Sequence, residues 1–216
     1  MNSLLAQIGS GFDEPVQHAQ AVFRTLLDAM SRPGHVLALP APALAGLQRP
    51  HDDDGQPLGA ALIAMLLTVL DAETTLYLGP RFGSDAADAY ARFHTGCRRV
   101  ALPAQAGFSA VTAAELDAAL WHTLPEGSDE QPQDGATLLV EVPGLAATPL
   151  PHAACLQLRG PGIQHAHTLA VQGIAAEVWR ARIAAQPDYP RGVDMVLCCG
   201  ERIAALPRST RITLEG

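Results

Sequence analysis

The chain has 216 residues, of which 48% are hydrophobic and 17% are charged, an ordinary globular composition that excludes wholesale disorder. Its formal net charge of −8 argues against nucleic acid or an anionic membrane as the main partner, because both attract a positive surface. All 14 basic residues are Arg and none is Lys. This excludes a Schiff-base lysine, and with it ordinary pyridoxal-phosphate chemistry, and also excludes the lysine of a phosphate-binding loop.

The spacing of the cysteines and the hydropathy pattern bear on the cellular compartment and do not indicate a metal or redox site. The four cysteines (97, 155, 198 and 199) show neither a Cys-x-x-Cys pair nor a zinc spacing, so we expect buried thiols in a reducing environment. The segment Met1 to Phe12 does not resemble a signal peptide. The longest apolar run, Leu58 to Leu70, is too short to cross a bilayer at 1.5 Å per residue. We expect a cytoplasmic protein.

The first half of the chain alternates between helical and strand-like patterns. Helical periodicity predicts helices over 15–30, 58–70 and 85–93, the second of them buried because it is apolar nearly all round. Short strands are predicted at 36–39, 74–78 and 99–102. The acidic run His51 to Gly55 lacks the alternating spacing of a calcium loop and is predicted to be a solvated turn.

The second half continues the alternation. Thr112 and Glu115 have the spacing of a capping box, which predicts a helix from there to about Thr123. A further helix is predicted at 175–185, and strands at 137–142, 155–159, 168–171 and 195–199, with an edge strand at 208–214. No repeat, linker or change of composition indicates a boundary. We therefore expect residues 1–216 to form a single α/β domain, a mixed sheet flanked by helices.

Three turns combine Gly or Pro with an Arg at the end of a strand: 158–163, 190–194 and 206–211. Glycine exposes backbone amides that can surround an anion, and a guanidinium offers a planar fork for phosphate or carboxylate oxygens. The candidate anion-binding residues are Arg159, Gly160, Gly162, Arg191 and Arg208. The alternative is that these are tight turns whose arginines pair with carboxylates such as Asp194.

Histidines supply the remaining candidates. His94, before the helix-ending Gly96, is either a general acid or base or a cation that caps the last helical carbonyls. His165 and His167 would share one face of a strand, but no third ligand has a readable spacing, so no metal site is predicted.

Several segments, in this order, resemble one family. They are Phe23 to Gly34, Leu67 to Asp71, Phe93 to Gly96, Gly127 to Pro132, Leu158 to Ile163, Tyr189 to Met195 and Ala205 to Arg211. The set resembles PhnH, a subunit family of the bacterial carbon–phosphorus lyase system for phosphonate degradation. The resemblance covers nearly the whole chain.

The resemblance implies a fold similar to the large domain of pyridoxal-phosphate transferases without the cofactor site, and no cofactor of its own. It implies a homodimer within a core complex with the G, I, J and K subunits. With its partners, the family takes part in making α-D-ribose 1-methylphosphonate 5-triphosphate from methylphosphonate and a purine nucleoside triphosphate, so a phosphonate or a nucleotide is the candidate ligand. The family supplies no established catalytic positions; the role of His94 as a proton donor to the departing base, with Asp194 as its polar companion, is our own hypothesis.

Three functions remain open at this point. The first is an accessory subunit that contributes structure and part of a substrate pocket. The second is a self-sufficient transferase or nucleosidase, which needs an acid, a base and an anion clamp in one pocket. The third is a purely structural assembly subunit. Whether Arg159, Arg191 and Arg208 converge on one cavity distinguishes among them.

Overall fold

A computed structural model describes residues 8–52 and 54–214. The helices are α2 (Pro15–Ser31), α3 (Ala41–Ala45), α4 (Ala60–Val69), α5 (Asp85–Thr95), α6 (Ala118–Thr123) and α7 (Ala176–Ala184). The strands are β1 (Leu37–Ala38), β2 (Thr75–Leu78), β3 (Arg98–Arg99), β4 (Phe108–Thr112), β5 (Thr137–Glu141), β6 (Leu145–Ala146), β7 (Ala153–Arg159), β8 (His167–Gln172), β9 (Asp194–Cys199), β10 (Arg202–Leu206) and β11 (Arg211–Leu214). Single 3-10 turns occur at η1 (Pro80–Phe82), η2 (Pro103–Gln105), η3 (Pro132–Asp134) and η4 (Gln186–Asp188).

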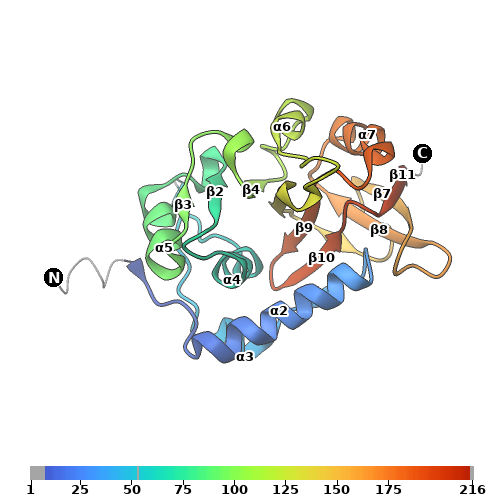
Figure 1. The fold of residues 1–216 in the computed structure, drawn as a ribbon. Helices are drawn as coiled ribbons and strands as arrows, with labels where there is room; N and C mark the ends of the chain where they lie inside the picture. Colours follow the sequence, from blue (N-terminus) through green and yellow to red (C-terminus); the bar gives the residue numbers. More distant parts are fainter. Residues whose placement is uncertain (1–7, 53, 215–216) are drawn as a thin grey trace.

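The strands form two sheets. The larger has seven strands in the order β1-β10-β9-β5-β4-β2-β3. Its five strands from β9 to β3 run parallel, and β10 and β1 join antiparallel beyond β9. The smaller sheet is antiparallel, in the order β11-β7-β8-β6. In Figure 1 the smaller sheet and α7 lie at the opposite end of the molecule from α5 and β3.

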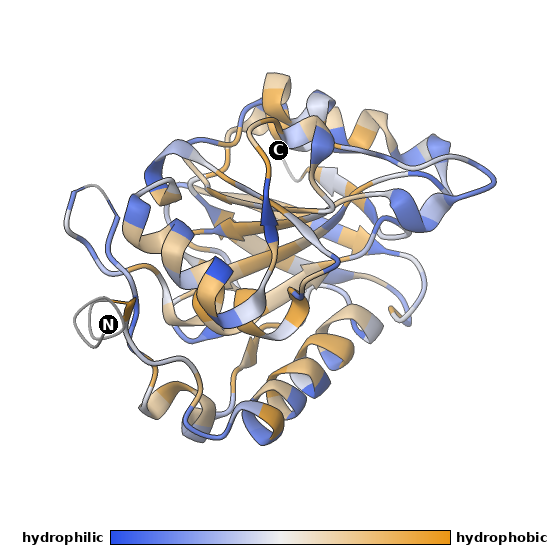
Figure 2. Cartoon of the chain, turned by 60° about the vertical axis from the view of Figure 1, so that its left-hand side comes forward, coloured by the Kyte–Doolittle hydropathy of each residue, from blue (hydrophilic) through white to orange (hydrophobic). Residues whose placement is uncertain are grey.

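Alternating side chains on the larger sheet build two separate cores. On β5, Leu139 packs with α2, α4 and α5, whereas Leu138 and Val140 pack with the smaller sheet, α6 and α7. All three side chains are fully buried, as expected for a parallel strand covered on both faces. Figure 2 shows these apolar strands enclosed between helices that carry hydrophilic residues on their outer sides. The larger sheet is therefore the middle layer of three.

Local signals explain where several helices begin and end. Pro15 opens α2, since its fixed φ suits the first turn. The Ser84 hydroxyl caps α5 by accepting the Ala87 amide at 3.2 Å, and Gly96 ends that helix at a φ of +74°. These two helices were predicted within two residues of their observed ends, as were α4 and α7.

The sequence predictions were wrong at Thr112 and missed three strands and the second sheet. Thr112 does not open a helix: it ends β4, and α6 begins only at Ala118, capped by Asp117. The Glu115 carboxylate does accept a hydrogen bond from the Thr112 amide at 2.9 Å. This hydrogen bond of the capping box therefore forms although no helix begins there. β4, β10 and β6 were not predicted, and the expected single sheet is accompanied by a second one.

The acidic run also differs from its prediction. Asp52 is buried, with 6% of its surface exposed, and its carboxylate accepts the Asp54 and Gln56 amides and the Arg81 Nε at 3.0, 2.7 and 2.9 Å. The segment is a turn, but Asp52 is an internal anchor rather than a solvated charge. Asp53 lies outside the described residues.

No helix in the described part of the chain is long and apolar enough to cross a membrane.

Candidate functional site

Two cavities in the described part of the chain are lined by arginine side chains and are the candidates for a binding site. The first, which we call the arginine corner, has a volume of about 370 Å³ and is lined by Arg159, Gly160, Pro161, Gln186, Tyr189, Arg208, Ser209, Thr210 and Arg211. The second, the strand-end cavity, has a volume of about 310 Å³ and is lined by Asp52, Gln56, Pro57, Leu58, Arg81, Phe82, Thr112, Ala113, Ala114, Glu141, Val142, Pro143 and Gly173. They share no lining residue.

The arginine corner joins two of the three predicted turns. β7 ends in Arg159 and β11 begins at Arg211, and the two residues are direct partners in the antiparallel ladder. The turn between β10 and β11 adds Arg208 from the same side. Arg159 is exposed, and among the described residues its one hydrogen bond is a long one from Nη1 to the His165 carbonyl oxygen, at 3.4 Å. Its guanidinium therefore has most of its donors available for an anion.

Arg208 differs, because the protein already occupies its donors. Its Nε and Nη2 donate to the Asp194 carboxylate at 3.1 and 2.7 Å, and its Nη1 donates to the Pro132 carbonyl. Asp194 also accepts the backbone amide of Arg208 at 2.7 Å. Asp194 thus positions Arg208, and it is not among the residues that line the cavity.

Arg191 does not join them. It pairs with Asp129 and Asp188 at 3.5 and 3.4 Å, and it lies outside the arginine corner, in a neighbouring void of about 10 Å³ that Arg208 also lines. A void of that size holds at most about one water molecule. The turn that carries Arg191 therefore fits the alternative considered from the sequence, in which arginine and carboxylates brace a loop.

The two glycines of the first turn, Gly160 and Gly162, lie in different surroundings and only Gly160 lines the arginine corner. Gly160 lines the arginine corner at a φ of +131°, and a Cβ there would lie 3.0 Å from the Ser209 carbonyl oxygen. Gly162 adopts a φ of +78° and packs against the end of α2, where a Cβ would collide with the Ser31 carbonyl oxygen. Gly162 therefore closes the fold and Gly160 shapes the cavity.

A buried arginine, Arg182, holds the backbone next to the arginine corner in place. Arg182 on α7 is 4% exposed and donates to the carbonyl oxygens of Val193, Leu206 and Pro207, each at 2.9 Å. Burial lowers the pKa of this guanidinium to about 10, which still leaves it charged at neutral pH. It ties β9 and the turn after β10 to α7, and nothing in the sequence analysis identified it.

The predicted histidines lie elsewhere. His94 is on α5, at the far end of the molecule from β11 (Figure 1), with its Nε2 3.1 Å from the Gly9 carbonyl oxygen. The His167 Nε2 is 3.1 Å from the Gly34 carbonyl oxygen, and its ring stacks on His35 at 4.4 Å. His165 is exposed. None of these histidines lines either cavity, and the described residues hold no group of three or more side chains able to bind a metal.

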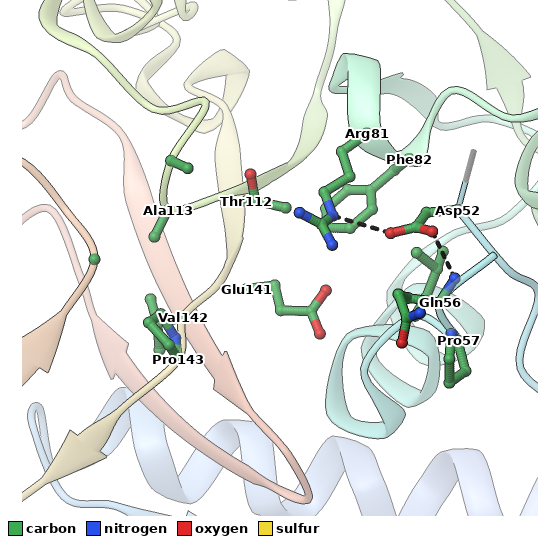
Figure 3. A pocket seen from close by; sticks show the side chains of 13 residues that line it. Asp52, Gln56, Pro57, Arg81, Phe82, Thr112, Ala113, Glu141, Val142 and Pro143 are labelled. Carbon is green, nitrogen blue, oxygen red and sulfur yellow. Dashed lines mark hydrogen bonds and ion pairs between the residues drawn. The ribbon is translucent and has the colours of Figure 1, made fainter. Parts of the chain in front are cut away.

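The strand-end cavity lies where parallel strands finish. Arg81 follows β2 in η1, Thr112 ends β4 and Glu141 ends β5, so the carboxyl ends of three neighbouring strands supply three of its polar side chains. Open α/β sheets bind ligands at this edge. Figure 3 shows that the side chains of Asp52, Arg81 and Glu141 point into the same space.

Arg81 is fixed at its base and open at its tip. Its backbone amide donates to Glu115, and its Nε donates to buried Asp52 at 2.9 Å. The amides of Gln56 and Asp54, together with Arg81, hold the pKa of Asp52 below its usual value despite burial. A charged, anchored carboxylate thus orients a guanidinium whose side chain is 48% exposed.

Glu141 is the unusual group of this cavity. Burial raises the pKa of its carboxyl, against the backbone amide of Gly59 and the charges of Arg81 and Arg49, which lower it. Gly59 is the residue before α4, and a Cβ there would collide with Glu141 Oε1. The absence of a side chain at Gly59 therefore allows the carboxyl to reach the start of α4.

The strand-end cavity was not predicted from the sequence, although one signal for it was present. Arg81 and Glu141 each follow or end a strand that the sequence predicted correctly, and polar residues at the carboxyl ends of parallel strands are candidates for a site.

Comparison with known proteins assigns the chain to a family. The family model described as "Bacterial phosphonate metabolism protein (PhnH)" matches residues 10–213. A Rhizobium meliloti (strain 1021) protein named alpha-D-ribose 1-methylphosphonate 5-triphosphate synthase subunit PhnH is 33% identical over 216 aligned residues, covering 97% of this chain and 98% of that protein. A Stutzerimonas stutzeri protein named putative C-P lyase subunit protein HtxG is 33% identical over 202 residues, covering 91% of this chain and 87% of its own length. On the extent of these matches, the chain belongs to the PhnH family of bacterial phosphonate metabolism proteins.

Proposed function

We propose that this chain is an accessory subunit of a bacterial carbon–phosphorus lyase assembly and takes part in forming α-D-ribose 1-methylphosphonate 5-triphosphate from methylphosphonate and a purine nucleoside triphosphate. The observation that carries the proposal is the match to the Rhizobium meliloti synthase subunit, which extends over nearly the full length of both chains. The family match over residues 10–213 supports the same role.

The geometry favours a subunit over a self-sufficient enzyme. In the described residues the arginine corner offers an anion clamp, but no histidine side chain lines it to serve as acid or base. A complete transferase site would bring these groups together in one pocket. We therefore assign the proposed contribution of this chain to anion binding and assembly, with the remaining groups supplied by its partners.

Within this proposal the arginine corner binds a phosphonate or a nucleotide phosphate through Arg159, Gly160 and Arg208. The open guanidinium of Arg159 supports this more strongly than Arg208, which is already paired with Asp194. Arg191 and Gly162 play a bracing part, as their contacts indicate. A bidentate charge-assisted contact contributes about 1.5–3 kcal/mol, so its loss weakens binding roughly tenfold to a hundredfold.

The finer organisation is also proposed. Residues 1–216 form one domain, which the larger sheet shared by both cores supports. The chain pairs as a homodimer and assembles with the G, I, J and K subunits in the cytoplasm. Its parallel strands correspond to the large domain of pyridoxal-phosphate transferases, and the lack of any lysine is consistent with a lost cofactor site.

The test is complementation of a bacterium that lacks its own family member, grown on methylphosphonate as the sole phosphorus source. We expect the wild-type chain to restore growth and to co-purify with tagged partner subunits. Arg159→Ala combined with Arg211→Ala should abolish or slow growth, whereas Arg180→Ala, an exposed arginine on α7 outside the cavity, should not.

Each result distinguishes the functions left open by the sequence. Lost growth with an intact complex supports substrate contact at the arginine corner. Lost growth with a lost complex supports a role in assembly alone. Failure of the wild-type chain to restore growth, with the complex absent, contradicts the proposal, and unchanged growth of the double variant removes the arginine corner from it.

A further inference from the structure

The strand-end cavity has the components of an anion site that the proposed function does not use. It contains a cation with an open edge, Arg81, and a half-buried acid, Glu141, whose side chains face the same space (Figure 3). Both are held in place by contacts outside the cavity, through Asp52 and Glu115 for Arg81 and through Gly59 for Glu141. Pre-positioned groups of this kind bind without further ordering cost.

The open edge of Arg81 faces the cavity. Asp52 accepts only from Nε, and within residues 8–52 and 54–214 neither terminal nitrogen of Arg81 has a hydrogen-bond partner. Asp52 cannot follow the guanidinium, because its other oxygen is held by the amides of Asp54 and Gln56. The two terminal nitrogens therefore form a fork, a geometry that matches two oxygens of one anion.

The carboxyl group of Glu141 restricts which anions can bind to the two terminal nitrogens of Arg81. Titratable groups around it come from several elements: the charged Arg81 in η1, Arg49 and Asp52 in the loop before α4, and the neutral, buried thiol of Cys198 in β9. A fully ionised anion placed against Glu141 would meet a second negative charge, which is unfavourable unless one proton lies between them. An anion that keeps a proton near neutral pH can share it with this carboxyl.

The volume of the strand-end cavity and its apolar walls further restrict which anions it can bind. A volume of about 310 Å³ is at the lower end for ligand pockets, which suits a small molecule rather than a whole nucleoside triphosphate. The walls beside the polar groups are apolar: Leu58, Phe82 and Val142 are buried side chains that line the cavity. A short organic substituent on the anion would pack against them.

We propose that the strand-end cavity is a binding site for a small phosphate- or phosphonate-type anion, with two oxygens on the open edge of Arg81 and one proton shared with Glu141. The site is separate from the arginine corner and belongs to the isolated chain, so it does not depend on the assembly role proposed above.

Titration calorimetry of the purified chain at pH 7 tests this with three probes: methylphosphonate, inorganic phosphate and sulfate. Sulfate has the same shape but carries no proton at this pH. We expect the two protonatable anions to bind at least tenfold more tightly than sulfate. Methylphosphonate should bind about threefold to fivefold more tightly than phosphate, from burial of its methyl group.

Variants then assign the preference to this cavity. Glu141→Gln keeps the shape but offers an amide N–H, so sulfate should bind more tightly and the preference should disappear. Arg81→Met should abolish the preference for protonatable anions over sulfate, and Arg180→Ala, at an exposed arginine on α7 outside both cavities, should leave that preference intact. If Arg81→Met fails to fold because Asp52 is left unpaired, Glu141→Gln alone decides.

Two results overturn the proposal. One is equal binding of sulfate and phosphate to the wild type, or no binding of either protonatable anion. The other is a preference for protonatable anions that persists in Glu141→Gln or disappears in Arg180→Ala. Failure of the complementation experiment leaves this site standing, because calorimetry measures the free chain.

Discussion

The arginine corner and the strand-end cavity use arginine in different ways. In the arginine corner, local turns bring together several arginines, of which Arg208 is largely satisfied by Asp194 and Pro132 whereas Arg159 is left mostly open. In the strand-end cavity a single arginine, Arg81, is anchored on one side and left open on the other. The comparison teaches that the number of arginines in a cavity is a poor measure of its capacity for an anion. What counts is how many donors the protein has left unpaired.

The largest expected effect concerns the support behind the arginine corner. Arg182→Met should lower the free energy of unfolding by about 3–5 kcal/mol, because three buried carbonyl oxygens lose their donor. Urea denaturation followed by circular dichroism measures this. Arg180→Met, an exposed arginine on the same helix, is the matched control and should change stability by less than about 0.5 kcal/mol. Similar losses in both variants would show that Arg182 does not brace the corner.

A smaller effect distinguishes a structural Arg208 from a ligand-binding one. We expect a double-mutant cycle of Asp194→Asn and Arg208→Gln to give a coupling energy of about 1.5–3 kcal/mol in the free protein, since both side chains are more than four-fifths buried and share charge-assisted hydrogen bonds. Unfolding by urea supplies the four free energies. A coupling near zero would mean that Arg208 is free to serve a ligand, and the contrast between the two cavities would weaken.

The smallest effect is a pH dependence at Glu141. Burial raises the pKa of this carboxyl in the folded chain, so its contribution to stability is fully present below the unfolded pKa and is lost as the pH rises through the folded value. Glu141→Gln should therefore gain stability relative to the wild type between about pH 4.5 and pH 7, and the gain should shrink on acidification. Thermal unfolding across this range measures it. A gain that grows towards low pH would contradict the raised pKa.

Elements with strong local patterns could be predicted from the sequence. The apolar spacing of α2, the all-apolar α4 and the apolar run of β5 each identify the element and its burial. β4 was missed because Thr112 and Glu115 have helical capping spacing, yet five parallel pairings with β5 hold the preceding residues in the sheet. Tertiary pairing overrode a local signal there.

β10 was missed for a different reason. It forms a hairpin with β9 across Gly200, which has a φ of +60°, between two apolar runs. That is a recognised turn signal and could have been used.

The two cavities also differ in how far the sequence could predict them. Arg159 and Arg208 could be proposed from their turns, but only the structure separates them from Arg191 and Gly162. The strand-end cavity draws on Asp52, Arg81 and Glu141, whose proximity depends on the order of strands in the larger sheet. Strand order is a long-range property, and no spacing along the chain encodes it directly.

That strand order has a consequence for how the protein forms during translation. β9 and β10, at residues 194–206, lie between β5 and β1 in the sheet. Leu37 in β1 therefore has no strand partner until Ile203 in β10 has been synthesised. Until that segment leaves the ribosome, β5 exposes an unpaired apolar edge and α2 lacks the strand it covers. Contacts this distant in sequence slow folding. The nascent chain should therefore be most vulnerable to aggregation and to chaperone capture just before its last strands are synthesised.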